Sequence, residues 1–284
     1  MFDKLEIFKS QLGEISYFDN HLKSNKCVFF LHGFPDSPEN WLKIAHEIAK
    51  YNYRVILPFL PGYFPSSATF KSYFIKDVAL EIKGLIKFLK LENVSLVGHD
   101  WGALICYELC STLDQEINKI CTLSVPPLIV MTSAFTNYNQ LKLSWYMFFF
   151  QLQIADFIIP LNDFNFIKNL YKDWSISFNE QAITNAINCI KNPGNLTSAL
   201  SYYREIFKPE NLALLGQDKL NKPLLYLHGQ NDGCISIQSV KDILTFLPDG
   251  SIFKVIENAG HFLNLDCPEI VIANLINYLN DSTS

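Results

Sequence analysis

The sequence Gly-His-Asp-Trp-Gly at residues 98–102 constrains the fold more than any other stretch of the chain. It follows an apolar run from Val94 to Val97 that is typical of a buried strand, and it precedes a helical pattern that begins near Ala103. Two glycines that flank a central residue at this spacing indicate a tight turn from strand to helix, a nucleophile elbow. The spacing therefore predicts that the side chain of Asp100 projects into a pocket above the start of a helix.

Asp100 occupies the position at which an elbow usually carries serine. Serine attacks acyl carbon, whereas a carboxylate attacks saturated carbon and leaves an alkyl ester on the enzyme. Partial positive charge at the start of the helix favours the ionised carboxylate. The alternative is that Asp100 only caps the helix, because aspartate is a favoured N-cap residue. Its partners elsewhere in the chain decide between the two interpretations.

Short apolar runs alternate with helical patterns along most of the chain. Residues 5–19 alternate weakly and are expected to form antiparallel strands at one edge of a sheet. The succession of apolar runs and helical patterns is typical of an α/β fold in which helices flank both faces of a mostly parallel central sheet. We expect the buried strands of that sheet at residues 27–31, 55–57, 94–97, 117–123, 223–228 and 252–256.

The alternation stops between residues 126 and 207, where helical patterns and aromatic clusters occur without a convincing strand. The sequence therefore predicts one α/β core, residues 1–125 and 208–284, interrupted by a helical insertion at 126–207. The insertion leaves the core one strand after the elbow, so we expect it to lie over the pocket of Asp100 as a cap. Catalytic residues of such a sheet are expected in loops at the carboxyl ends of strands.

Two further polar residues follow predicted strands of the core. His261 lies in the loop after the last strand, and Asp232 lies in the loop after the strand before it. Each has an ordinary alternative, since histidine is common in loops and aspartate is common in turns. The chain order of nucleophile, acid and histidine nevertheless matches the triad that accompanies a nucleophile elbow. We therefore predict a catalytic triad of Asp100, Asp232 and His261.

The sequence His-Gly-Phe-Pro at residues 32–35 follows the first buried strand. Its position allows the backbone amide of Phe34 to point toward the pocket, and Trp101, directly after Asp100, supplies a second amide. Two such amides can hold the oxyanion that forms when an ester intermediate is hydrolysed. We predict this oxyanion hole at Phe34 and Trp101, and we expect both side chains to contact the substrate.

Together these motifs resemble the epoxide hydrolases of the α/β-hydrolase fold, and the resemblance covers nearly the whole chain. It rests on residues 32–35, the elbow, the loops of Asp232 and His261, and two stretches of the helical insertion. Haloalkane and haloacid dehalogenases, including fluoroacetate dehalogenases, share the elbow and the triad. Those motifs therefore do not distinguish epoxide hydrolases from dehalogenases, and the distinction has to come from residues of the insertion.

The resemblance implies two tyrosines in the insertion that hold and protonate the epoxide oxygen. In the family one tyrosine comes before a Phe-Gln pair, which matches Tyr146, and the other precedes an arginine, which matches Tyr203. Tyr202 is an adjacent alternative for the second position, and both tyrosines could instead be packing residues. Aromatic residues of the insertion, such as Trp145 and Phe149, are expected to line an apolar pocket.

The resemblance therefore implies hydrolysis of an apolar epoxide to a vicinal diol through a covalent ester on Asp100. A haloalkane dehalogenase is the first alternative, but many of those enzymes carry asparagine where this chain has Phe34. Fluoroacetate dehalogenases typically carry arginine where this chain has Trp101. A ligand-binding homologue without activity is the second alternative, although binding alone would not need both tyrosines.

Composition argues against several other classes of protein. The net charge of −5 and the lack of a Lys/Arg cluster argue against a nucleic-acid-binding surface. Seven cysteines without paired spacing predict free thiols and no metal site, and the implied reaction needs no cofactor. The first residues lack the apolar core of a signal peptide, and the aromatic stretch 145–161 is too short and too often interrupted for a membrane span. We therefore expect a cytoplasmic protein, as a monomer or homodimer. The resemblance adds a small hydrophobic epoxide as its binding partner.

Overall fold

An eight-stranded sheet, with the strand order β1-β2-β4-β3-β5-β6-β7-β8, forms the centre of the computed structural model, which describes residues 1–10, 12–113, 115–212 and 220–281. Strand β2 is antiparallel to its neighbours β1 and β4, and the other neighbouring pairs are parallel. The strands are β1 (Leu5–Lys9), β2 (Glu14–Asp19), β3 (Cys27–Leu31), β4 (Arg54–Pro58), β5 (Val94–His99), β6 (Ile117–Leu123), β7 (Leu225–Gly229) and β8 (Ile252–Ile256). The α/β-hydrolase fold class expected from the sequence is confirmed.

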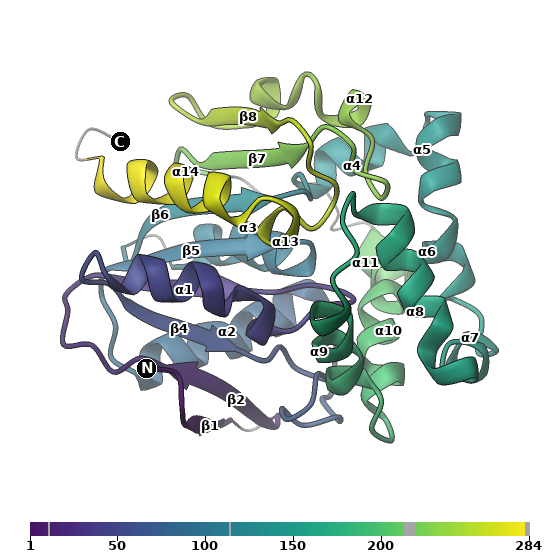
Figure 1. Cartoon of the computed structure of the whole chain (residues 1–284), viewed down its shortest axis with the longest axis horizontal. Helices are drawn as coiled ribbons and strands as arrows, with labels where there is room; N and C mark the ends of the chain where they lie inside the picture. Colours follow the sequence, from purple (N-terminus) through teal and green to yellow (C-terminus); the bar gives the residue numbers. More distant parts are fainter. Residues whose placement is uncertain (11, 114, 213–219, 282–284) are drawn as a thin grey trace.

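Helices cover both faces of this sheet. Helices α1 (Leu42–Ala49) and α14 (Pro268–Asn280) lie on one face, in front of the sheet in Figure 1, and α2 (Ile75–Phe88) and α3 (Trp101–Thr112) lie behind it. Short helical turns complete the core: η1 (Pro38–Trp41), α12 (Ile237–Val240), η2 (Ile243–Phe246) and α13 (Leu263–Asp266).

The central strands are apolar on both faces because both faces are covered. All five residues of β3 are buried. Val28 and Phe30 pack into the cluster that includes α1 and α14, whereas Phe29 and Leu31 pack into the cluster that includes α2 and α3. Successive side chains of a strand point to opposite faces, so one continuous apolar run supplies two cores.

A run of helices connects β6 to β7, and we call residues 128–212 the helical segment. Figure 1 shows it on the side of the sheet toward which the arrows of the parallel strands point, away from the chain termini. Its last helix begins after residue 207, the expected end of the insertion. Its members are α4 (Leu128–Ala134), α5 (Tyr138–Leu143), α6 (Trp145–Phe149), α7 (Ala155–Ile158), α8 (Leu161–Trp174), α9 (Glu180–Ile190), α10 (Asn195–Ile206) and α11 (Pro209–Leu212).

Buried hydrogen bonds join the helical segment to loops at the carboxyl ends of β3 and β4. The hydroxyl of Tyr171 donates to the carbonyl of Pro35 at 2.6 Å, and the hydroxyl of Tyr202 donates to the carbonyl of Pro61 at 2.8 Å. The side-chain amide of Asn195 donates to a third carbonyl, that of residue 62, at 2.7 Å. The segment is therefore packed onto the core by specific polar contacts as well as by apolar surface.

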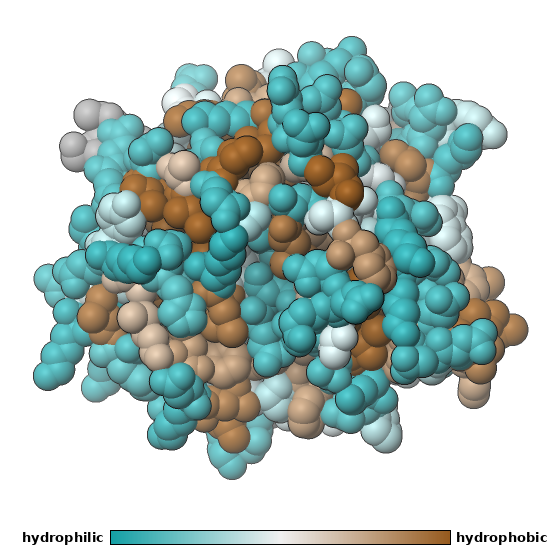
Figure 2. Space-filling model, viewed as in Figure 1, coloured by the Kyte–Doolittle hydropathy of each residue, from teal (hydrophilic) through white to brown (hydrophobic). Residues whose placement is uncertain are grey.

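Apolar side chains are exposed around α7. Figure 2 shows them at the edge of the molecule where Figure 1 places this helix. Phe157 is 76% exposed and Leu161 is 60% exposed. None of the helices in the described parts of the chain is long and apolar enough to cross a membrane.

The turn between β5 and α3 brings two backbones into direct contact. A Cβ atom on Gly98 would overlap the carbonyl of Gly102, and a Cβ atom on Gly102 would overlap the carbonyl oxygen of Leu31 on β3. Asp100 between them has a φ of 53° and a ψ of −119°, which a non-glycine residue rarely adopts. Only glycine allows α3 to begin this close to β3, and the turn therefore directs the side chain of Asp100 outward.

The substitution Gly102→Ala should lower the free energy of unfolding by about 3 kcal/mol or more, because the new methyl group overlaps backbone that cannot move aside. Urea unfolding followed by circular dichroism measures the change. Gly84→Ala in α2 is the matched control, since its Cβ would meet only the ring of Phe8, at 3.2 Å. A Gly102→Ala protein as stable as this control would contradict the close approach.

Candidate active site

Three polar residues meet at the carboxyl ends of the sheet. Asp100 follows β5, Asp232 follows β7 and His261 follows β8. The Nδ1 atom of His261 lies 3.0 Å from Oδ2 of Asp232, and its Nε2 atom lies 3.6 Å from Oδ2 of Asp100. The structure thus brings the three residues of the expected triad together, with the imidazole between the two carboxylates.

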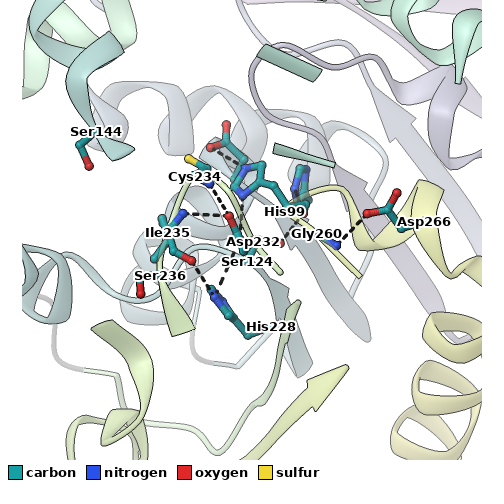
Figure 3. A network of polar contacts seen from close by, with 12 residues as sticks. His99, Ser124, Ser144, His228, Asp232, Cys234, Ile235, Ser236, Gly260 and Asp266 are labelled. Atoms are coloured by element: carbon teal, nitrogen blue, oxygen red, sulfur yellow. Dashed lines mark hydrogen bonds and ion pairs between the residues drawn. The ribbon is translucent and has the colours of Figure 1, made fainter. Parts of the chain in front are cut away.

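Asp232 is fixed by its own loop. Its Oδ1 atom accepts hydrogen bonds from the amides of Cys234 at 2.7 Å and Ile235 at 2.8 Å, as Figure 3 shows. The imidazole of His228 donates to the carbonyl of Ile235 at 3.0 Å and so supports the same loop. Burial alone would raise the pKa of Asp232, but the neighbouring His261 outweighs it and lowers that pKa. Asp232 is therefore an ionised carboxylate that points one oxygen at His261.

The backbone of His261 is held from three directions. Its amide donates to the carbonyl of Trp174 in the helical segment at 2.7 Å. Its carbonyl accepts from the imidazole of His99 at 2.9 Å and from the hydroxyl of Ser124. His99 therefore supports the loop of His261, a role that could not be read from its place beside Asp100 in the sequence.

The two carboxylates determine the charge of His261. Burial lowers the pKa of this imidazole, but Asp232 and Asp100 outweigh burial and raise the pKa to about 10. His261 is therefore protonated at neutral pH. A histidinium cannot accept a proton, so in this charge state the imidazole of His261 can act only as a proton donor.

The loop after β3 holds the carboxylate of Asp100. The amide of Phe34 donates to Oδ1 of Asp100 at 2.7 Å. His32 secures this loop, because its Nδ1 donates to the carbonyl of Gly33 and its Nε2 accepts from the amide of Leu60, both at 3.0 Å. Burial lowers the pKa of His32 to about 4, so its imidazole is neutral and structural.

Trp101 is the first residue of α3. Amides in the first turn of a helix have no acceptor within the helix. The amide of Trp101 therefore begins α3 directly beside the carboxylate of Asp100, and the amide of Phe34 approaches the same side chain from another loop.

An apolar cavity opens at Asp100 and extends between the core and the helical segment. The expected residues Asp100, Trp101, Tyr146 and Tyr203 line it. The side chain of Phe34 does not line it, but its ring centre lies 5.5 Å from that of Tyr203. Most of the other lining residues are apolar: Leu104, Val125, Leu128, Met131, Thr132, Phe135, Met147, Ile206, Cys234 and Ile235.

Like Phe34, the expected aromatic residues Trp145 and Phe149 are not part of this cavity. Trp145 is 47% exposed, and its ring packs on Phe149 and Phe166. Phe149 is stacked on Phe166 at 5.3 Å. They lie on α6 with Tyr146, but the helix turns them away from the cavity that Tyr146 lines.

The two expected tyrosines reach the cavity from different helices. Tyr146 lies on α6 and Tyr203 on α10, and their ring centres are 5.8 Å apart. Within the described residues the hydroxyl of Tyr203 has no hydrogen-bond partner. Burial raises the pKa of both hydroxyls, so both stay protonated and can donate hydrogen bonds. Tyr202 instead gives its proton to the carbonyl of Pro61, outside the cavity.

Two side chains join the helices that carry the tyrosines. The amide of Gln151 donates to the carbonyl of Met147 at 2.9 Å and to the carbonyl of Tyr203 at 3.1 Å. Arg204 donates to the carbonyl of Phe150 at 2.9 Å and pairs with Asp156. The glutamine and arginine that accompany the tyrosines in the sequence therefore fix the two helices relative to each other.

Cys234 is a cavity residue that the sequence did not single out. Its Sγ lies 3.1 Å from the hydroxyl of Tyr146. Cys234, Asp232 and His261 together lie close enough for one metal ion to contact all three. Burial raises the pKa of the Cys234 thiol well above its usual value, and Asp232 is already committed to two amides and His261. A neutral thiol is a poor metal ligand, so the three residues do not fit a metal site.

Comparisons with known proteins add to this geometry. The sequence pattern of the alpha/beta hydrolase fold family matches residues 26–268. Human epoxide hydrolase 4 is 26% identical over 92% of this chain and 74% of its own length. Epoxide hydrolase 1 of Caenorhabditis elegans is 27% identical over 89% of this chain and 64% of its own length, so the chain spans less than two thirds of that relative.

One solved structure is similar over nearly the whole chain. It is a mutant of an epoxide hydrolase from Bacillus megaterium, complexed with its product, a naphthyloxy-propane-1,2-diol. The two sequences are 26% identical, the TM-score is 0.80, and the match covers 97% of this chain and 100% of the other.

The charge of His261 can be measured directly. Because two carboxylates raise its pKa, the imidazolium should persist until the pH rises through about 10. Asp100→Asn removes one of the two charges and should lower that pKa. Histidine titration by NMR measures both values, and His32, with a pKa of about 4, is an internal control that should stay neutral. An unchanged pKa of His261 in Asp100→Asn would contradict the coupling.

Proposed function

The chain is a hydrolase that belongs to the alpha/beta hydrolase fold family, and we propose that it converts apolar epoxides to vicinal diols. The observation that carries this proposal is the pair of tyrosine hydroxyls that line one cavity with Asp100. Opening an epoxide leaves an alkoxide attached to the carbon skeleton, and this oxygen needs a proton. Two buried, protonated phenols beside a carboxylate suit that need.

In the first step Asp100 attacks a ring carbon. The amide of Phe34 holds Oδ1 at 2.7 Å, which leaves Oδ2 as the attacking atom. The bond from Oδ2 to carbon forms while the bond from that carbon to the ring oxygen breaks. Tyr146 and Tyr203 donate hydrogen bonds to the ring oxygen, and one of them transfers its proton to the alkoxide. The product of this step is a hydroxyalkyl ester of Asp100.

The proton of His261 then restores the tyrosine. Esterification removes the negative charge of Asp100, which was one cause of the raised pKa of His261. The imidazolium therefore becomes more acidic, and its proton passes to the phenolate. His261 is left neutral and still oriented by Asp232 at 3.0 Å, which is the state required of a general base.

In the second step His261 removes a proton from water, and the hydroxide attacks the carbonyl carbon of the ester. The amides of Phe34 and Trp101 stabilise the oxyanion. The diol leaves, Asp100 regains its charge and His261 keeps the proton from water. The sum of both steps is one epoxide and one water converted to one diol.

We further propose that residues 126–207, most of which belong to the helical segment, form a cap domain. It contributes both tyrosines and much of the apolar wall of the cavity. The apolar lining supports a hydrophobic substrate. The segment also covers His261, whose ring contacts that of Trp174 at 5.5 Å.

Dehalogenation is the second candidate, and one observation favours it. The indole nitrogen of Trp101 is buried and makes no hydrogen bond of normal geometry among the described residues, although it lies near the hydroxyl of Tyr203, whose pKa it lowers; Trp101 also lines the cavity. Such a donor could hold a halide. A haloalkane, however, requires no proton donor, so this alternative gives the two tyrosine hydroxyls no role.

Asp100→Asn should abolish diol formation from an apolar terminal epoxide, because an amide cannot form the ester. His261→Gln should still form the ester but release it slowly, so mass spectrometry of the quenched protein should find substrate attached to Asp100. Asp242→Asn, at an exposed carboxylate, is the matched control and should keep wild-type activity.

A 1-haloalkane assayed in parallel separates the two candidates. Halide release without diol would overturn the epoxide proposal and favour Trp101 as a halide donor. Neither product from a folded wild-type protein would contradict both enzymatic proposals and favour a ligand-binding homologue.

Tyr146→Phe and Tyr203→Phe should each lower kcat for the epoxide roughly 10- to 100-fold, since one of two donors to the ring oxygen is lost. The double variant should be inactive in the first step and form no ester. Tyr138→Phe, at a residue that is 74% exposed, is the control. Full activity in the double variant would show that the tyrosines are packing residues.

A further inference from the structure

The contact between Cys234 and Tyr146 points to a role for this thiol in the proposed reaction. We propose that Cys234 is a positioning residue that holds the hydroxyl of Tyr146 and donates a hydrogen bond to its oxygen when Tyr146 donates to the epoxide. This inference rests on the proposed function, because it assigns a partner to one of the two proton donors.

The geometry of the contact is specific. The Sγ atom lies 3.1 Å from the hydroxyl oxygen of Tyr146, both residues are buried, and both line the cavity that opens at Asp100. The backbone of Cys234 is fixed independently, because its amide donates to Oδ1 of Asp232 at 2.7 Å. Figure 3 shows the thiol directed away from that amide contact. The triad acid thus also determines where the thiol lies.

The hydrogen-bond chemistry of the two groups suits an exchange of roles. A phenol has one proton, and a thiol is a weak donor and a weak acceptor. Without substrate, the proton of Tyr146 can rest on Sγ, which orients the hydroxyl at little cost. With an epoxide bound, that proton turns to the ring oxygen, and the S–H group donates to the phenol oxygen in its place.

The same contact supports the phenolate that forms after proton transfer. When Tyr146 gives its proton to the alkoxide, its oxygen becomes an anion in an apolar cavity. Burial raises the pKa of both Tyr146 and Cys234, so the thiol keeps its proton and can donate it in a hydrogen bond to that oxygen. The phenolate then regains its proton from His261, and no proton leaves the thiol.

Tyr203 offers an internal contrast. Its hydroxyl lines the same cavity and lies in the electrostatic neighbourhood of Cys234, but no hydrogen bond joins the two side chains. The ring centre of Trp101 lies 4.8 Å from that of Tyr203. The thiol should therefore act through Tyr146 alone. This difference gives the test its control.

Three substitutions of Cys234 separate hydrogen bonding from packing. Cys234→Ser keeps a donor, Cys234→Val keeps the apolar volume without a donor, and Cys234→Ala loses both. Cys234→Ser should retain most of kcat for the epoxide. Cys234→Val and Cys234→Ala should lower kcat roughly 5-fold, which corresponds to the loss of one neutral hydrogen bond. If the thiol only fills space, Cys234→Val should be active and Cys234→Ser impaired, and that order would overturn the proposal.

A double-mutant cycle identifies the tyrosine involved. Cys234→Ala should lower kcat in the Tyr203→Phe background but have no further effect in the Tyr146→Phe background, because the partner is already gone. Equal losses in the two backgrounds would mean that the thiol does not act through Tyr146.

An infrared measurement needs no catalysis. The S–H stretching band of Cys234, isolated as the difference between wild type and Cys234→Ser, should shift in Tyr146→Phe and stay unchanged in Tyr203→Phe. Diol formation by wild type is the separate test of the proposed function. If the band behaves as expected but no diol forms, the proposed function fails and the contact remains. If diol forms and the S–H band is the same in wild type and Tyr146→Phe, only the proposed role of Cys234 fails.

Discussion

The close approach of two backbones, at the start of α3 and the end of β3, is the constraint on which the site depends. The missing side chain of Gly102 lets the helix begin against the carbonyl of Leu31, and the turn then leaves Asp100 with a positive φ. The same approach brings the loop after β3 within 2.7 Å of the carboxylate, through the amide of Phe34. One steric condition therefore places both the carboxylate and a donor that holds it, before any side chain of the helical segment is involved.

The buried charges form the second level of organisation. Two carboxylates and one imidazolium occupy a region with little solvent, where an unpaired charge would be costly. His261 lies between Asp232 and Asp100, which raises its pKa, while its own charge lowers the pKa of Asp232. Each proton position thus depends on the others. A reaction that neutralises Asp100 would alter the basicity of His261 without any movement of the chain, so the order of the two chemical steps would follow from electrostatics.

The sequence was most informative where local geometry decides the structure. The elbow glycines, the strand ends and the α/β fold class follow from short-range rules, and the fold class is confirmed. The packing of the helical segment was harder to predict, because the face of a short helix that points inward depends on contacts with residues far along the chain. Trp145 and Phe149 look like cavity residues in the sequence but pack on Phe166, and the contact of Cys234 with Tyr146 spans 88 positions. The catalytic roles themselves remain predictions.

The attachment of the helical segment limits how molecules can reach Asp100. The carbonyl of Trp174 accepts the amide of His261, and Tyr171 holds the carbonyl of Pro35 next to Phe34. A hinged opening of the whole segment would break these bonds and release the loops that carry His261 and Phe34. Small rotations of Met131, Phe135 and Met147 in the cavity wall, by contrast, would leave both bonds intact. Access through such rotations would depend on the narrowest cross-section of a molecule more than on its length, because flexible methionine side chains can move aside for a slender group without a change in the backbone.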